Sequence, residues 1–279
     1  MRKLLKRLRP IGPLSIAVVL SIAAILPILW ILSGSLRPSD EIFASINPLS
    51  WSTLVPSEVS LGNYIGLLGS GFGTALQNSF WSSVLAVVLG LSLSCLAAYS
   101  LAVLRFRGRA AIFAIVVVGF MIPFEAIAIP LSHQFKEIGL ANTMIGLVLP
   151  AIGNGLAIFY LRQHFLGIPK SLREAARMDG ASELRIMAAI YVPNSRAALA
   201  NSALLIFLGH WTAYLWPLLI ISDSRLQLAP IVLARTFGQY ATDFGQTFAG
   251  AILLTLLPAV FVILIYRFFG GIALTAGEK

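Results

Sequence analysis

The sequence is poor in charged residues. Asp, Glu, Lys and Arg make up 11% of the 279 residues and the mean hydropathy is +0.89, whereas a soluble globular domain carries about 25% charged residues. So few charges cannot cover a water-facing surface, and lipid must therefore solvate much of the protein. The composition excludes an ordinary soluble domain and predicts an integral membrane protein.

Side chains for metal, redox and nucleotide chemistry are also scarce. Cys95 is the single cysteine and lies in an apolar run, so no disulfide framework exists. The histidines, His133, His164 and His210, are far apart and have no cysteine or paired carboxylate beside them, so we expect no metal site. The chain lacks the Gly-x-x-x-x-Gly-Lys-Ser/Thr loop that cradles nucleotide phosphates. No cluster of nucleophile and base points to an enzyme.

What the chain has in abundance is apolar runs of membrane-spanning length. A transmembrane helix needs about 20 such residues, and backbone groups in lipid must be bonded within their own segment. The first run is too long for a signal peptide and reads as an uncleaved span. We therefore predict an all-α, polytopic bundle of six transmembrane helices at residues 13–34, 79–103, 110–131, 143–161, 198–221 and 247–269.

The placement of Lys and Arg predicts the orientation. Sixteen of the 20 basic residues fall on the side of the two termini, and only Arg37, Lys136, Arg225 and Arg235 fall on the other. Cytoplasmic loops carry this excess, so it accounts for the net charge of +9 without nucleic acid. We expect a cytoplasmic N-terminus at 1–12, a transmembrane domain at 13–269 and a cytoplasmic tail at 270–279.

The cytoplasmic loop between the fourth and fifth runs has its own pattern. Ser171 followed by Glu174 is a capping-box pattern that predicts a short helix, and Asp179-Gly180 is a helix breaker. A second helix is expected over residues 182–191, until Pro193. Small residues around the turn would let another surface approach the backbone closely.

Segment 168–193 resembles the EAA loop of the permease subunits of bacterial ABC importers. Met187 and Ala197 depart from the family pattern, where Phe and Pro are common. The matching positions are Glu174, Ala175, Ala176, Asp179, Gly180, Ala181, Ile190 and Pro193.

The resemblance extends over most of the chain. Residues 121–130, 142–150 and 211–217 are similar to the third, fourth and fifth spans of the carbohydrate-importer branch, although Thr212 replaces a usual Asn. The tail 271–279 resembles that of the G-type subunit of maltose importers, with Ala273 inserted. The resemblance implies an importer for a sugar or sugar-like solute in the bacterial plasma membrane.

The resemblance also implies partners and roles. The loop would be a coupling helix that docks on a separate ATPase through Glu174, Ala175, Ala176, Asp179, Gly180 and Ala181, and tail residues Thr275, Ala276 and Gly277 would reach the ATPase subunits. Two such ATPases would bind ATP and Mg, and this chain would need no cofactor. A second homologous permease subunit and an extracytoplasmic binding protein would complete the importer.

Polar and aromatic residues within the spans are candidates for the solute pathway, because rings stack on sugar faces and amides bond hydroxyl groups. An intramembrane carboxylate is a functional candidate, but Glu125 could equally be structural, and Trp211 and Tyr214 could be interfacial anchors. Prolines in the spans could mark ordinary kinks or broken helices. The candidate pathway residues are Asn78, Glu125, Asn154, His210, Trp211 and Tyr214.

Two other functions remain open at this point. An ABC permease for glycerol phosphate, amino acids or peptides would share the loop. An ion-coupled secondary carrier is less favoured, because Glu125 is nearly alone as an intramembrane charge and no internal repeat is visible.

Overall fold

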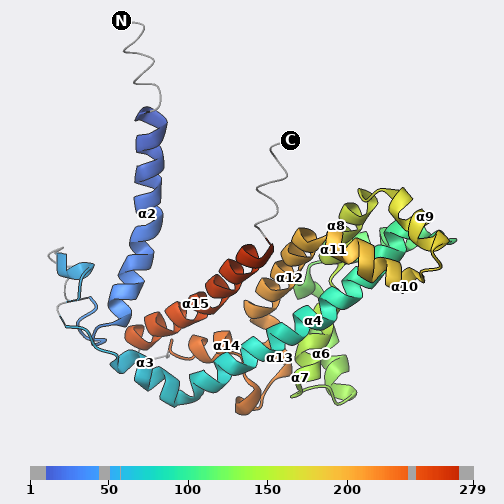
Figure 1. Cartoon of the computed structure of the whole chain (residues 1–279). Helices are drawn as coiled ribbons and strands as arrows, with labels where there is room; N and C mark the ends of the chain where they lie inside the picture. The colour runs from blue at the N-terminus through green and yellow to red at the C-terminus, as the bar shows by residue number, and fades with distance from the viewer. Residues whose placement is uncertain (1–10, 44–50, 57, 238–242, 270–279) are drawn as a thin grey trace, which may run out of the picture. The chain divides into compact units, whose positions relative to one another are not determined.

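The computed structural model describes residues 11–43, 51–56, 58–237 and 243–269, and these residues contain no long β-strand. They form two compact units (Figure 1): unit 1 contains the described residues up to Gly73 and from Val232 to Thr255, and unit 2 contains Thr74–Ile231 and the described residues from Leu256 onward. The all-α prediction is confirmed.

Unit 1 is organised by the first long helix. Helix α2 (Ile11–Ser35) presents nearly all its large apolar side chains outward, as expected for a helix that contacts lipid or another subunit. At its C-terminal end the Asn63 amide donates to the carbonyls of Ser35 (3.1 Å) and Arg37 (2.6 Å). Trp30 packs edge-on against Phe248 with ring centroids 5.2 Å apart. These contacts hold α2 to helix α15 (Phe244–Phe269) and helix α3 (Gly62–Leu67).

Unit 2 is built on helix α4 (Gly73–Val103), which begins earlier than the predicted span at 79–103. Before it, α3 and the π-helical turn η2 (Leu68–Phe72) continue the helix across a kink at Gly71, whose φ is 91°. The predicted loop 35–78 is therefore partly helical. Serine and alanine make up most of the buried face of α4, and such small side chains allow neighbouring helices to approach its backbone closely.

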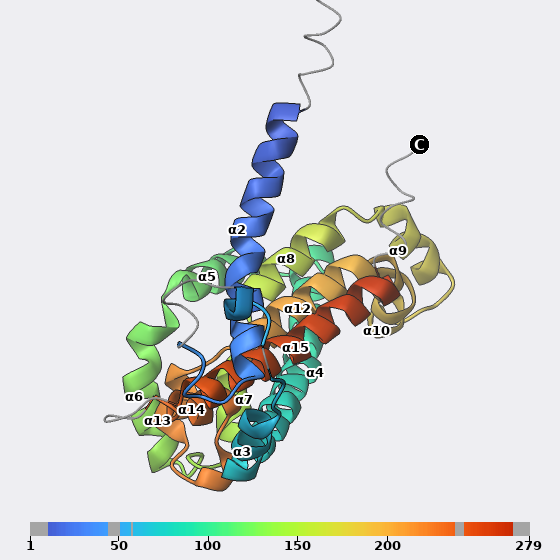
Figure 2. The same cartoon turned by 90° about the vertical axis from the view of Figure 1, so that its left-hand side faces the viewer.

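The third apolar run is two helices rather than one. Helix α5 (Arg109–Met121) and helix α6 (Phe124–Glu137) meet at 95°, and Figure 2 shows this turn. Proline disfavours a helical conformation in the residue before it, and Ile122 before Pro123 is accordingly extended, with ψ 122°. Pro123 therefore breaks the run, whereas Pro130, Pro217 and Pro258 lie inside helices.

The fourth run is bent as well. Helices α7 (Met144–Ile152) and α8 (Gly155–Leu166) meet at 42°. Each has a side-chain cap: Thr143 accepts from the Gly146 amide and Asn154 accepts from the Ala157 amide, both at 2.9 Å. Thr143 caps the start of α7, whereas Asn154 lies at the bend and satisfies a backbone donor that a break inside a membrane would otherwise leave unpaired.

The fifth run divides between helix α12 (Arg196–Trp211) and helix α13 (Leu215–Ile220). Neither piece is long enough to cross a bilayer by itself. Among the described residues, three helices are long and apolar enough to cross a membrane, or five if each bent pair counts as one span. The predicted count of six is therefore not confirmed, because turns at Pro123, Gly153 and Thr212 interrupt the runs. Outside the charged loop, the remaining elements are η1 (Trp51–Thr53), η4 (Ser224–Leu226) and α14 (Ala229–Ala234).

A polar staple joins two loops at one end of unit 2. The Asn142 carboxamide oxygen accepts from the Ser222 amide (2.7 Å) and the Asp223 amide (2.9 Å), while its nitrogen donates to the Ser222 hydroxyl (2.9 Å). Asn142 has φ 53°, a left-handed conformation that Asn tolerates better than most residues. Backbone conformation and hydrogen bonding therefore both favour Asn here.

We expect Asn142→Gly to lower the free energy of unfolding by about 1–2 kcal/mol, because Gly keeps the positive φ but removes the side-chain hydrogen bonds to Ser222 and Asp223. Asn142→Ala should cost more, because its Cβ adds strain in the left-handed region. Thermal unfolding of the purified protein, followed by tryptophan fluorescence, measures both. Equal stability of Asn142→Gly and the wild type would contradict the staple.

Candidate functional site

The charged loop forms two short helices at one end of unit 2 (Figure 1). Helix α9 (Lys170–Met178) begins directly after Pro169, and no side-chain hydrogen bond caps it. The capping-box prediction is therefore wrong: Ser171 is the second residue inside the helix. Because Pro169 takes an extended conformation (φ −57°, ψ 128°) and is itself the N-cap residue, the helix begins two residues before the position that the pattern indicated.

The turn after α9 has the geometry that its sequence predicts. Gly180 has φ 78°, in the left-handed region. The Ala181 amide donates to the Ala176 carbonyl and the Gly180 amide donates to the Arg177 carbonyl, both at 3.0 Å. This pair of bonds is a Schellman motif, which satisfies the last carbonyls of a helix. A Cβ on Gly180 would meet no atom within 4 Å, so the space beside this glycine is open.

The second helix starts where predicted but does not stop at Pro193. Ser182 caps helix α10 (Glu183–Ile186) by accepting from the Arg185 amide. A π-helical turn, η3 (Met187–Tyr191), then continues into α11 (Val192–Asn194). The side-chain amide of Asn194 donates to the Ile190 carbonyl (2.7 Å), so a side chain contributes to the hydrogen bonding of this last turn.

The carboxylate of Glu183 clamps this loop to the long helix α4. Arg173 of α9 donates to both its oxygens, at 2.6 and 3.2 Å, and the Tyr99 hydroxyl of α4 donates to Oε2 at 2.6 Å. The hydrogen bonds from Arg173 hold the pKa of Glu183 below its ordinary value and raise the pKa of Arg173. The Tyr99 ring packs edge-on against Tyr191, 5.0 Å away. We call Tyr99, Arg173 and Glu183 the clamp.

Sequence reasoning did not find the clamp. Its three residues come from separate helices. In the sequence, Arg173 and Glu183 cannot be told apart from charged residues that face solvent. The one signal in the sequence was the length and charge of this loop. A simple connection between two helices does not need so many carboxylates and guanidiniums, so ion pairs within the loop could have been expected.

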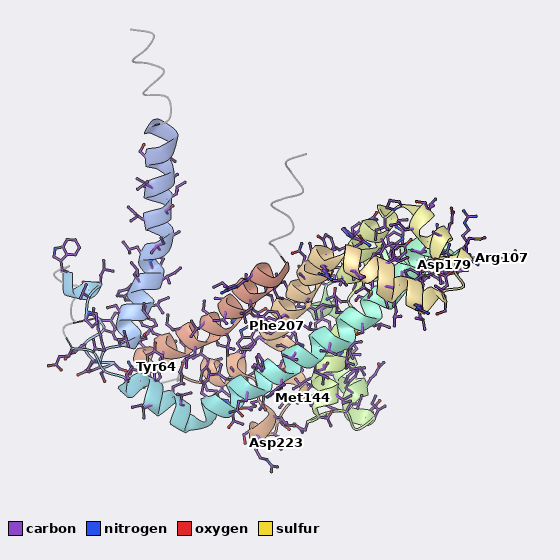
Figure 3. The ribbon with its side chains drawn as sticks, viewed as in Figure 1. Tyr64, Arg107, Met144, Asp179, Phe207 and Asp223 are labelled. Carbon is purple, nitrogen blue, oxygen red and sulfur yellow. The ribbon has the colours of Figure 1, made fainter. Side chains whose placement is uncertain are left out.

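The clamp leaves the predicted coupling residues at the surface. Glu174, Ala175, Asp179 and Gly180 are exposed. Ala176 and Ala181 are half-buried and pack against the apolar cluster beneath. Figure 3 shows Asp179 at the same end of the unit as Arg107, and Asp223 at the opposite end. The loop thus presents a hydrogen-bonded turn of small residues with two exposed carboxylates, Glu174 and Asp179.

A second concave site lies among the membrane helices of unit 2. It encloses about 250 Å³, and His210 and Asn154 line it together with Phe124 and Trp216. His210 is 5% exposed, and its Nε2 has no hydrogen-bond partner among the described residues. A buried polar atom without a partner is costly, so this nitrogen suits a polar ligand or an ordered water. The structure places His210 and Asn154, two of the predicted pathway residues, in the lining of the same pocket.

Other candidate pathway residues lie elsewhere. The Asn78 amide donates to the Arg225 and Gln227 carbonyls (2.8 and 3.1 Å), so it fastens a loop. Trp211 is buried and stacks on Phe207. Glu125, in the first turn of α6, and Tyr214 are exposed. The three tail candidates, Thr275, Ala276 and Gly277, lie outside the described residues.

Comparison with known proteins identifies the family. Residues 86–272 match the family described as binding-protein-dependent transport system inner membrane component. The chain belongs to this family of ABC importer permeases. It is 35% identical to the arabinooligosaccharides transport system permease protein AraQ of Halalkalibacterium halodurans, over 91% of this chain and 90% of the relative. It is 33% identical to the sn-glycerol-3-phosphate transport system permease protein UgpE of Rhizobium meliloti, over 89% and 90%.

The fold of this permease also matches a solved structure. A chain of a bacterial ABC transporter involved in the import of the acidic polysaccharide alginate superposes with a TM-score of 0.79 at 24% identity, covering 94% of this chain and 96% of that one. This permease is thus a multi-pass membrane subunit of an ABC importer, and its fold class is confirmed.

The clamp yields a prediction about pH. The pKa of Glu183 is lowered in the folded permease from an ordinary value of 4.5, so the clamp stabilises the loop above pH 4.5 and loses that stabilisation as the pH falls through and below this value. Glu183→Gln should remove about 1–2 kcal/mol at neutral pH, seen as faster hydrogen exchange of the α9 amides.

Glu174→Gln is the matched control, because Glu174 is exposed and makes no hydrogen bond or ion pair among the described residues. Its α9 amides should exchange at the wild-type rate. If both variants exchange alike, Glu183 does not anchor the loop.

Proposed function

We propose that this permease forms half of a transmembrane pathway for a sugar or sugar-like solute, and that the turn at Glu174–Gly180 receives the force of ATP hydrolysis from a separate ATPase. The observation that carries this proposal is the rigid, exposed turn held to α4 by the clamp. A surface that transmits motion must be stiffly joined to what it moves. Tyr99 belongs to a helix of the membrane domain, so displacement of α9 is passed directly to that helix.

The residues of the turn suit docking into a cleft. Ala175 and Gly180 leave the backbone accessible, and Glu174 offers a charge for a basic partner residue. The two ATPases would bind ATP and Mg, and their closure would move two such turns, one from each permease subunit. This is a rigid-body switch of the kind that ligand binding biases. An extracytoplasmic binding protein would deliver the solute at the opposite end.

The orientation follows from the same assignment. The turn must lie in the cytoplasm, where ATP is available, and the asymmetry of Lys and Arg supports this placement. Both termini then lie in the cytoplasm too. On this assignment the staple around Asn142 and Asp223 faces the outside, and the domain limits at 13 and 269 remain predictions.

The pocket around His210 supports a neutral, hydroxyl-rich solute. Aromatic rings and amides suit sugar rings, and among its described lining residues there is no Lys or Arg. A phosphate group would need cations. UgpE-like relatives keep glycerol phosphate as the second candidate. ATPase activity of the complete importer, stimulated by its binding protein with each solute class, tests the choice: stimulation by glycerol phosphate or an amino acid with sugars inert would overturn the sugar assignment.

The coupling role predicts uncoupling by Glu174→Ala and Gly180→Asn. Asn tolerates the left-handed conformation that Gly180 adopts, so Gly180→Asn should fold normally yet block close approach of a partner. We expect uptake by the reconstituted importer to fall at least tenfold in each variant, with assembly retained. Ser171→Ala is the control, because Ser171 does not cap α9.

Uptake at the wild-type rate in both variants, with complexes intact, would remove the coupling assignment. Full activity in Gly180→Asn alone would show that only the backbone conformation matters there, not the close approach of another chain.

The pathway role predicts a different phenotype for His210. We expect His210→Leu to reduce solute uptake and solute-stimulated ATPase activity while basal ATPase activity persists, because the coupling turn is untouched. The control is His133→Gln, because His133 is exposed and lies outside the pocket. It should leave solute uptake and solute-stimulated ATPase activity unchanged. If His210→Leu transports normally, the pocket lies off the pathway.

A further inference from the structure

A large cavity lies between α9 and the end of α4. It encloses about 760 Å³, three times the volume of the pocket around His210. One side is a single face of α9, because Lys170, Arg173, Glu174 and Arg177 follow the i, i+3, i+4, i+7 spacing of a helix face. The other side is the connection from α4 to α5, including Arg105 and Arg109.

The charge of this cavity is unbalanced. Five cations line it against two carboxylates, Glu174 and Glu183, which leaves a net charge of +3. Glu183 is committed to Arg173 and Tyr99 within the clamp. Among the described residues, the side chains of Arg105 and Lys170 have neither a hydrogen bond nor an ion pair. Cations gathered without partners repel one another, so an anion bound among them would relieve this repulsion.

The walls between the charges are apolar. Val103, Leu104 and Phe106 come from the end of α4 and the residues after it, and Phe165, Leu166 and Ile168 come from the end of α8. The apolar segment that qualifies as a membrane span by length and composition ends at Val103, and Arg105 is the first charged residue after it. The cavity therefore begins where the apolar sequence gives way to basic residues. A soluble anion needs cations alone, whereas a lipid needs cations beside an apolar wall.

We propose that this cavity binds the phosphate of an anionic phospholipid, with Arg105, Arg109 and Lys170 around the phosphate and the acyl chains along Leu104 and Phe106. Basic pockets beside membrane helices recognise such headgroups. The bound lipid bridges α9 and the α4–α5 connection, two elements that no described ion pair joins. Its occupancy therefore stiffens the attachment of α9 to the membrane domain.

This inference rests on the family membership and not on the identity of the solute. Lipid retention is measured without substrate, binding protein or ATP hydrolysis, so its failure and the failure of the proposed function are separate results.

The test is native mass spectrometry of the complete importer purified with a mixture of phosphatidylglycerol and phosphatidylcholine. The site variant is the double substitution Arg105→Gln and Lys170→Gln. The matched control is Arg107→Gln with Arg185→Gln: it removes the same charge from the α4–α5 connection and from α10 of the charged loop, but neither residue lines the cavity. We expect wild type and control to retain phosphatidylglycerol preferentially. The site variant should lose affinity by about fivefold for each cation removed.

Several outcomes would overturn the proposal. Equal losses in the site and control variants would mean general surface attraction. Equal retention of both lipids by the wild type would mean that the cavity does not select an anion, or that the ATPase fills it. Displacement of phosphatidylglycerol by inorganic phosphate, but not by sodium chloride of the same ionic strength, would assign the cavity to a soluble phosphate.

Discussion

The carboxylate of Glu183 is the group on which the arrangement of the cytoplasmic end depends. It belongs to α10, accepts two hydrogen bonds from Arg173 of α9, and accepts a third from Tyr99 of α4. Charge-assisted, bidentate bonds of this kind have a defined geometry as well as strength. Without them the α9–α10 hairpin would be joined to the membrane helices through the apolar contacts of Ile186 and Tyr191, which resist separation but fix orientation less well.

The rest of the α9–α11 loop is also fixed by hydrogen bonds. The Schellman turn at Gly180 closes α9, Ser182 caps α10, and Asn194 bonds a carbonyl near Pro193, so every irregular point of the loop has its own hydrogen bond. The coupling role that we propose requires a loop whose backbone groups keep fixed hydrogen-bond partners. The exposed carboxylate of Glu174 is then the part of α9 left free to meet another chain.

Within the membrane the constraint is backbone satisfaction. The breaks at Pro123 and Gly153 bend the helical runs by 95° and 42°, and Asn154 caps the helix that follows the bend at Gly153. Asn154 also lines the pocket of His210, so one amide serves both a cap and a concave site. Irregular backbone at membrane depth is tolerated where it is buried in protein or lines a cavity, and this pocket is such a place.

Much of the molecule could be read from the order of its residues. Apolar run length determined the helical membrane class, and the Glu174–Gly180 pattern determined the family and the turn, because both depend on local chemistry. Run length could not show that Pro123 produces a 95° bend or that α12 ends at Trp211, because a hydropathy pattern carries no angle. Residue type made Asn78 and Trp211 pathway candidates, but only the tertiary structure shows that Asn78 donates to two loop carbonyls and that Trp211 is buried against Phe207. The clamp and the basic cavity were decided by tertiary structure alone, because Tyr99, Arg105, Arg173 and Glu183 meet only after separate helices have packed.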